Sequence, residues 1–180
     1  MPFAYYKRLS RKQQSVYRKS DGITTLRLPK AADLSPLVMR LEYSLRSGVP
    51  TSVETEAQSL LSAIVERLQA PPVRVSVLTV RPHDEYAELH GLYRPAAGRG
   101  QAQIAVWMHT ARRQRVVAFK TFLRTLLHEL CHHLDYELLG LAESFHTVGF
   151  YKRESSLFKQ LLAPASQDPH ALAGANANTG

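Results

Sequence analysis

Apolar residues in the first half of the chain recur at the three- and four-residue intervals of an amphipathic helix. One such stretch covers residues 34–45. A second begins at Thr51, which forms the pattern of a capping box with Glu54, and it continues to Leu68. The pattern therefore predicts two consecutive helices before any strand.

The middle of the chain changes to the two-residue alternation of half-buried strands. Residues 73–77 alternate valine with polar side chains, and residues 101–109 alternate in the same way. Residues 86–93 form a weaker strand candidate. We therefore expect a small sheet at the centre of the chain.

Helical spacing returns after the sheet-forming part. Leucines form one stripe between residues 116 and 139, and Gly140 is placed to end that helix. A last helix is expected from residue 146 to 162, followed by a small, polar tail, residues 163–180, whose composition indicates disorder. This order of elements predicts an α+β domain, a small mixed sheet packed on helices.

Length and composition agree with a single globular domain. The chain has 180 residues, of which 44% are hydrophobic, so it is long enough for one core and short for two. Cys131 is the only cysteine, which excludes both an internal disulfide and a four-cysteine zinc ribbon. The chain shows neither a secretion signal nor an apolar run of membrane-spanning length. We therefore expect a soluble, cytoplasmic protein with no membrane contact.

Positive charge is concentrated at the N-terminus. The formal net charge is +8, and the first 30 residues contain one acid, Asp21, against Lys7, Arg8, Arg11, Lys12, Arg18, Lys19, Arg27 and Lys30. We expect a basic N-terminal arm, residues 1–30, with its first four basic residues along one helical face. Together with nearby tyrosines, such a patch can bind DNA through phosphates and base stacking. The alternative is a solvated leading segment.

Candidate chemistry lies within the long predicted helix, at His128-Glu129-Leu130-Cys131-His132. Residues four apart project from one helical face at a separation of about 6 Å, so both histidines can hold one Zn²⁺ ion. A catalytic zinc site has three protein ligands and leaves a fourth position for water. Glu129 lies roughly 100° around the helix from His128, where it can take a proton from that water.

The third ligand has to come from another segment. His146 is favoured, because Gly140 allows the chain to turn back and a helix beginning near residue 146 can bring this side chain to the metal. Glu143 is the first alternative, since carboxylates also serve as zinc ligands. Asp135 shares a helical stripe with the two histidines, and we interpret it first as a hydrogen-bond acceptor and only then as a ligand.

These motifs resemble the SprT-like zinc metallopeptidases, which include the Spartan and WLM-type proteases of DNA–protein crosslink repair. Their pattern is HExxH, a short connection, and a third histidine followed four places later by phenylalanine. Here thirteen residues separate His132 from His146, and Phe150 occupies the phenylalanine position.

The resemblance implies a zincin-like metallopeptidase domain over residues 31–162, with His128, His132 and His146 as zinc ligands and Glu129 as the general base. It also implies an edge strand along the cleft to which a substrate peptide adds, and residues 101–109 are the candidate for that strand.

No oxyanion-stabilising residue is evident from the sequence. His133, Tyr151 and Arg153 are candidates, but each is expected to be a surface or packing residue. Cys131 is interpreted as a small buried residue and not as a nucleophile.

The sequence thus supports a zinc-dependent endopeptidase that hydrolyses peptide bonds of a protein or peptide substrate. A narrower variant adds tethering to DNA through the basic arm, so that DNA-bound proteins are the substrates. The alternative is a nucleic-acid-binding or interaction protein in which the zinc is structural.

Overall fold

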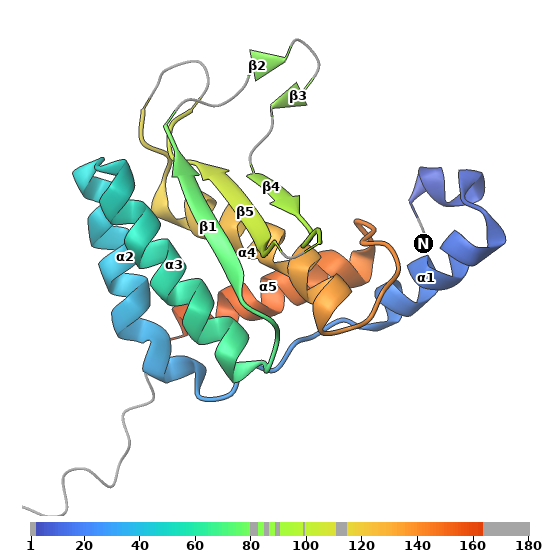
Figure 1. Ribbon diagram of the computed structural model, residues 1–180. Coiled ribbons are helices and arrows are strands. Elements are labelled where there is room, and N and C mark those ends of the chain that lie inside the picture. The colour runs from blue at the N-terminus through green and yellow to red at the C-terminus, as the bar shows by residue number, and fades with distance from the viewer. Residues whose placement is uncertain are drawn as a thin grey trace, which may run out of the picture.

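A computed structural model describes residues 3–79, 83–84, 87–88, 91–98, 100–110 and 115–163 (Figure 1). The predicted disordered tail lies outside the described residues, apart from Ala163. The described part contains five α-helices and a small mixed sheet, so the predicted α+β class is confirmed.

The N-terminal half is helical, as the apolar spacing predicts. It contains the 3₁₀ turns η1 and η2 and the first three helices, whose bounds are η1 Ala4–Arg8, α1 Arg11–Gly22, η2 Ala31–Leu34, α2 Ser35–Ser47 and α3 Pro50–Arg67. Helices α2 and α3 pack side by side (Figure 1).

The predicted capping box at the start of α3 is wrong. The helix begins one residue earlier, at Pro50, and its N-cap, Val49, offers no side-chain hydrogen bond. Proline is favourable in the first helical turn because its missing N–H has no partner there in any case. Glu54 instead accepts a hydrogen bond from the backbone N–H of Val77, at 2.9 Å.

The main sheet has three strands in the order β1-β5-β4. Their bounds are β1 Val73–Leu78, β4 Gly91–Arg94 and β5 Ala102–Trp107. Strand β5 is parallel to β1 and antiparallel to β4. Two short strands, β2 His83–Asp84 and β3 Ala87–Glu88, form a separate hairpin-like pair.

The prediction that residues 101–109 form an edge strand is wrong. Strand β5 lies in the middle of the sheet, because both of its edges bond to neighbouring strands. The outer edge of β1 is also covered, since Gln58 of α3 accepts from the N–H of Val75 at 2.8 Å and donates to the carbonyl of Val73 at 3.0 Å. Within the described sheet, the edge that borders the candidate site is therefore that of β4.

The core lies between the helices and this sheet. Strand β1 buries each of its valines, and α3 packs against it, while α4, Phe119–Glu137, packs against β4 and β5. The last helix, α5, Val148–Leu162, packs along α4 (Figure 1). Helix α4 ends three residues before Gly140, close to the predicted stop. No helix in the described part of the chain has both the length and the apolar composition needed to cross a membrane.

The basic N-terminal residues are folded onto the rest of the domain. Ser10 and Gln13 form a capping box that starts α1, so Lys7 and Arg8 belong to η1 and do not share one helical face with Arg11 and Lys12, as was expected. Helix α1 packs against α5. The outward side remains strongly basic, because its exposed side chains include Lys7, Arg8, Arg11, Lys12, Arg18 and Lys19.

Candidate metal centre

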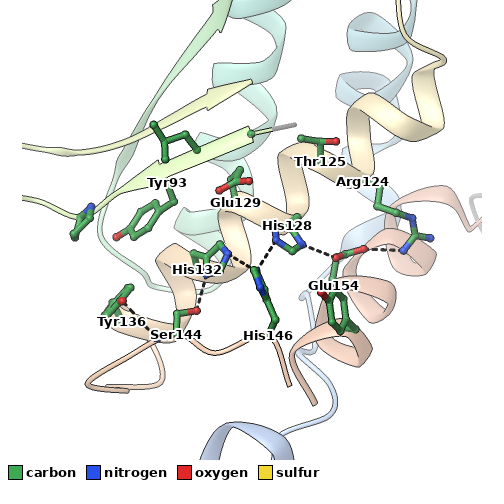
Figure 2. A pocket seen from close by; sticks show the side chains of 14 residues that line it. Tyr93, Arg124, Thr125, His128, Glu129, His132, Tyr136, Ser144, His146 and Glu154 are labelled. Carbon is green, nitrogen blue, oxygen red and sulfur yellow. Dashed lines mark hydrogen bonds and ion pairs between the residues drawn. The ribbon is translucent and has the colours of Figure 1, made fainter. Parts of the chain in front are cut away.

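Helix α4 presents two histidines on one side while its leucines face the core. The predicted leucine stripe is buried at Leu123, Leu127, Leu130 and Leu134, whereas its last member, Leu138, is exposed. This anchoring sets the rotation of the helix about its axis. His128 and His132, one turn apart, therefore point into the same cavity, with Glu129 beside them (Figure 2).

His146 reaches the same point from the connection between α4 and α5. Its Nε2 atom lies 3.0 Å from Nε2 of His128 and 3.1 Å from Nε2 of His132. The predicted final helix starts at Val148, with Thr147 as N-cap, so His146 precedes the helix and is not part of it. The structure thus brings together the three histidines that the sequence singled out, from two separate segments (Figure 2).

A carboxylate on α5 orients the ring of His128. Nδ1 of His128 lies 3.0 Å from Oε2 of Glu154, whose other oxygen accepts from Arg124 at 2.7 Å. Because a carboxylate paired with arginine only accepts, Nδ1 of His128 carries the proton. In the neutral ring, Nε2 therefore presents a lone pair toward His146.

A longer chain of hydrogen bonds orients His132. Nδ1 of His132 lies 2.7 Å from Oγ of Ser144, and that hydroxyl donates to Asp135 at 2.8 Å. Since the hydroxyl proton is used on Asp135, Nδ1 of His132 is the donor to Ser144. Asp135 in turn accepts from the buried guanidinium of Arg153 at 2.7 Å. Nε2 of His132 is therefore also an unprotonated lone pair facing the cavity.

This set of donor atoms fits a metal ion. Two lone pairs meet beside a third ring that can donate at most one proton, so hydrogen bonds among the histidines cannot satisfy all three nitrogens. Nitrogens bound to one tetrahedral zinc ion at about 2.0–2.1 Å would lie about 3.4 Å apart, close to the separations of 3.0 and 3.1 Å found here. His128, His132 and His146 can therefore hold a metal ion.

The pKa values of two of the histidines also favour metal binding. Burial, together with the neighbouring His128 and His146, lowers the pKa of His132 to about 3. Burial also lowers the pKa of His146, with His128 acting in the same direction. Both rings are therefore neutral at physiological pH, which is the form that binds metals.

Glu129 lies next to the histidines in a tightly limited space. The side chain is 7% exposed, and burial raises its pKa to about 7 against the opposing effects of His128 and a backbone hydrogen bond from Tyr93. A Cβ atom on Gly91 would lie only 2.5 Å from Oε1 of Glu129. The glycine in β4 therefore allows the carboxylate to occupy its position against the strand.

The histidines and Glu129 open into one cavity of about 740 Å³. Strand β4 forms one wall through Gly91, Leu92 and Tyr93. Tyr151 of α5 also lines the cavity, with its ring stacked on His146 at a centroid distance of 5.8 Å. The candidate metal site thus borders both strand β4 and an aromatic side chain.

The two alternative third ligands are engaged elsewhere. Glu143 accepts a hydrogen bond from Nε2 of Gln13 at 3.1 Å. Asp135 is fully buried, bonds Ser144 and Arg153, and so takes the acceptor role that was its first interpretation. Neither carboxylate belongs to the group of ligand atoms that converge among the described residues.

Among the oxyanion candidates, only Tyr151 lines the cavity. His133 is buried, with its Nε2 atom 2.8 Å from the carbonyl of Pro71 and its Nδ1 atom 3.3 Å from the hydroxyl of Tyr93. Arg153 is buried behind the site, so both are packing residues as expected. Cys131 is also buried, and burial raises the pKa of its thiol, which agrees with a packing role.

Sequence reasoning missed the residues that surround the ligands. Glu154, Ser144, Tyr93 and Gly91 line the cavity, yet the last three have no diagnostic spacing from the motif. Glu154 alone had a usable signal, because it lies four residues after Phe150 on the predicted last helix, on the side that must face the metal if His146 does.

Comparison of the chain with protein-family models, with curated proteins and with solved structures gives no match.

Two alanine substitutions in the connection between α4 and α5 distinguish the candidates for the third metal ligand. We expect one metal ion per wild-type chain, loss of the ion in His146→Ala, and retention in Glu143→Ala, because the Glu143 carboxylate bonds Gln13 and is not among the converging ligand atoms. Elemental analysis of the purified proteins measures this. An ion kept by His146→Ala and lost by Glu143→Ala would contradict the three-histidine site.

Proposed function

We propose that this protein is a zinc-dependent metallopeptidase of the SprT-like type, with a zincin-like fold, that hydrolyses peptide bonds of proteins. The observation that carries the proposal is the convergence of three imidazoles beside a nearly buried glutamate in one cavity. Imidazole donors suit zinc, and three protein ligands are the number found at catalytic zinc sites. The His128–His132 pair on a helix, with His146 and Phe150 downstream, supports the SprT-like assignment.

Zinc bound here would act as a Lewis acid on the substrate carbonyl and would make water more acidic. Glu129 is the residue that moves the proton. Its carboxylate takes a proton from the attacking water and returns it to the leaving amine. The confined space beside Gly91 holds the carboxylate in place for both transfers.

In the described sheet β4 is an edge strand, which supports an extended peptide as the substrate. One backbone N–H of this strand, that of Tyr93, already bonds Glu129. A peptide can add to an exposed strand through main-chain hydrogen bonds, which makes recognition largely independent of sequence. Strand β4 lines the cavity, whereas α3 side chains cover the edge of β1. The substrate chain therefore lies along β4, with its scissile bond above the histidines.

A structural zinc site in an interaction protein is the competing function. Structural zinc sites are normally closed by four protein ligands. The described residues supply three converging ligand atoms and an adjacent open cavity, which favours the peptidase.

The basic outer side of η1 and α1 supports an extension in which DNA-bound proteins are the substrates. Its exposed lysines and arginines can contact phosphates without sequence preference. DNA that leaves the rate of protein hydrolysis unchanged at low ionic strength would remove this extension and leave the peptidase intact.

Glu129→Gln tests the proton-transfer role with an almost isosteric change. We expect hydrolysis of an unfolded protein substrate to fall roughly 100- to 10,000-fold, the usual contribution of a general base, while zinc content stays at the wild-type value. Hydrolysis is measured by gel densitometry on zinc-loaded protein. Wild-type activity in a zinc-loaded Glu129→Gln protein would refute the proposal and favour the structural-zinc alternative.

Gly91→Ala tests whether the position of the carboxylate matters. The added methyl would meet the Cγ, Cδ and Oε1 atoms of Glu129, so this side chain has to move, whereas we expect the zinc content to stay at the wild-type value. Hydrolysis should nevertheless fall roughly 100-fold, as for a catalytic group displaced by about 1 Å. Gly22→Ala is the matched control, because no atom lies within 4 Å of its added methyl. Equal activities of the two variants would show that the Gly91–Glu129 contact is irrelevant.

A further inference from the structure

The connection that carries His146 depends on distant residues for its shape. Residues 138–147 join α4 to α5 without a helix or strand of their own. Two of the three ligands are fixed by α4, but the third is on this connection. The position of His146 therefore follows from whatever holds the connection in place.

The N-terminal segment, residues 3–23, makes contacts along the whole of that connection. Tyr5 donates from its hydroxyl to the backbone carbonyl of His146 itself, at 3.0 Å. Gln13 of α1 donates to Glu143 at 3.1 Å. Tyr17 is buried and packs its ring against Phe145 at a centroid distance of 6.1 Å.

The same segment holds both ends of the connection. Lys19 donates to the carbonyl of Leu139 at 3.2 Å, next to the end of α4. At the other end, Asp21 accepts from the N–H of Gly149 at 3.0 Å. A Cβ atom on Gly149 would collide with the backbone carbonyl of Ser20, so α1 and the start of α5 are in direct backbone contact.

Arg153 joins the N-terminal segment to the second ligand as well. Its guanidinium donates to the carbonyls of Ser20 and Ile23, at 2.7 and 2.6 Å, and to Asp135 at 2.7 Å. Asp135 begins the hydrogen-bond chain through Ser144 to His132. Two of the three histidines are thus connected to residues more than 100 positions earlier in the chain.

We propose that the N-terminal segment is a structural part of the metal centre and that Tyr5 is a positioning residue for the third ligand, His146. The inference rests on the metal site of the proposed function. The Tyr5 hydroxyl fixes the backbone of His146. The connection is therefore already ordered before a metal ion binds, and the Nε2 atom of His146 lies beside those of His128 and His132. Metal affinity therefore depends on a segment whose basic composition suggested either DNA binding or a solvated leading segment.

Tyr5→Phe removes this hydrogen bond and keeps the ring that stacks on Phe3. We expect the Zn²⁺ affinity, measured by competition with a chromogenic chelator on the full-length protein, to fall roughly three- to tenfold, the range for one lost hydrogen bond. Tyr6→Phe is the matched control. Its hydroxyl accepts from Arg18 and contacts no part of the connection among the described residues, so affinity should stay at the wild-type value.

Gln13→Glu provides a second, independent variant. Glutamate can still accept from the N–H of Ser10 in the capping box, but it places a negative charge against Glu143 in place of the amide donor. The expected result is again weaker Zn²⁺ binding. Unfolding of the metal-free proteins by denaturant checks that each variant folds like the wild type.

A double-variant cycle shows whether Tyr5 acts through His146. In a His146→Ala background, Tyr5→Phe should change the remaining Zn²⁺ affinity by less than about twofold. The inference is overturned if Tyr5→Phe and Gln13→Glu both bind Zn²⁺ like the wild type, if Tyr6→Phe loses as much, or if the loss persists without His146. A protein that binds Zn²⁺ as expected but hydrolyses nothing would refute the peptidase alone, and a wild type that binds no Zn²⁺ would refute both.

Discussion

The buried ion pair between Arg153 and Asp135 is the interaction on which the candidate site depends. Both side chains are fully buried, and their charged atoms lie 2.7 Å apart. Arg153 comes from α5 and Asp135 from α4, and the guanidinium also binds the end of α1. Removing one partner of such a pair typically costs about 3–5 kcal/mol, because the other charge stays buried and unpaired. The pair therefore fixes three helices at the point from which Ser144 and His132 are oriented.

The metal centre and the cavity are both built on this framework. The leucine stripe and the ion pair set the rotation of α4, and that rotation directs His128 and His132 into the cavity. The sheet contributes on the other side, where β4 brings Gly91 against Glu129. In the proposed peptidase, α4 thus carries two ligands and the proton carrier, the α4–α5 connection carries the third ligand, and β4 provides the substrate strand.

Local periodicity predicted the parts of this arrangement that depend on local geometry. The four-residue spacing of His128 and His132 determines their common face in any helix, and the helix itself followed from its leucines. Strand order was not predictable in the same way. Residues 101–109 alternate cleanly whether they form a central or an edge strand, and only the pairing with β1 and β4 decides between them. Tyr5 and Glu154 were also missed, because their roles arise from contacts between segments far apart in the chain.

The most direct test of the central claim is a crystal structure of the zinc-loaded protein, with anomalous diffraction recorded on both sides of the zinc absorption edge. The account predicts one strong anomalous peak at about 2.0–2.1 Å from the Nε2 atoms of His128, His132 and His146, with no fourth protein ligand. A zinc ion held by Glu143 or Asp135, or the absence of a peak among the three histidines, would contradict it.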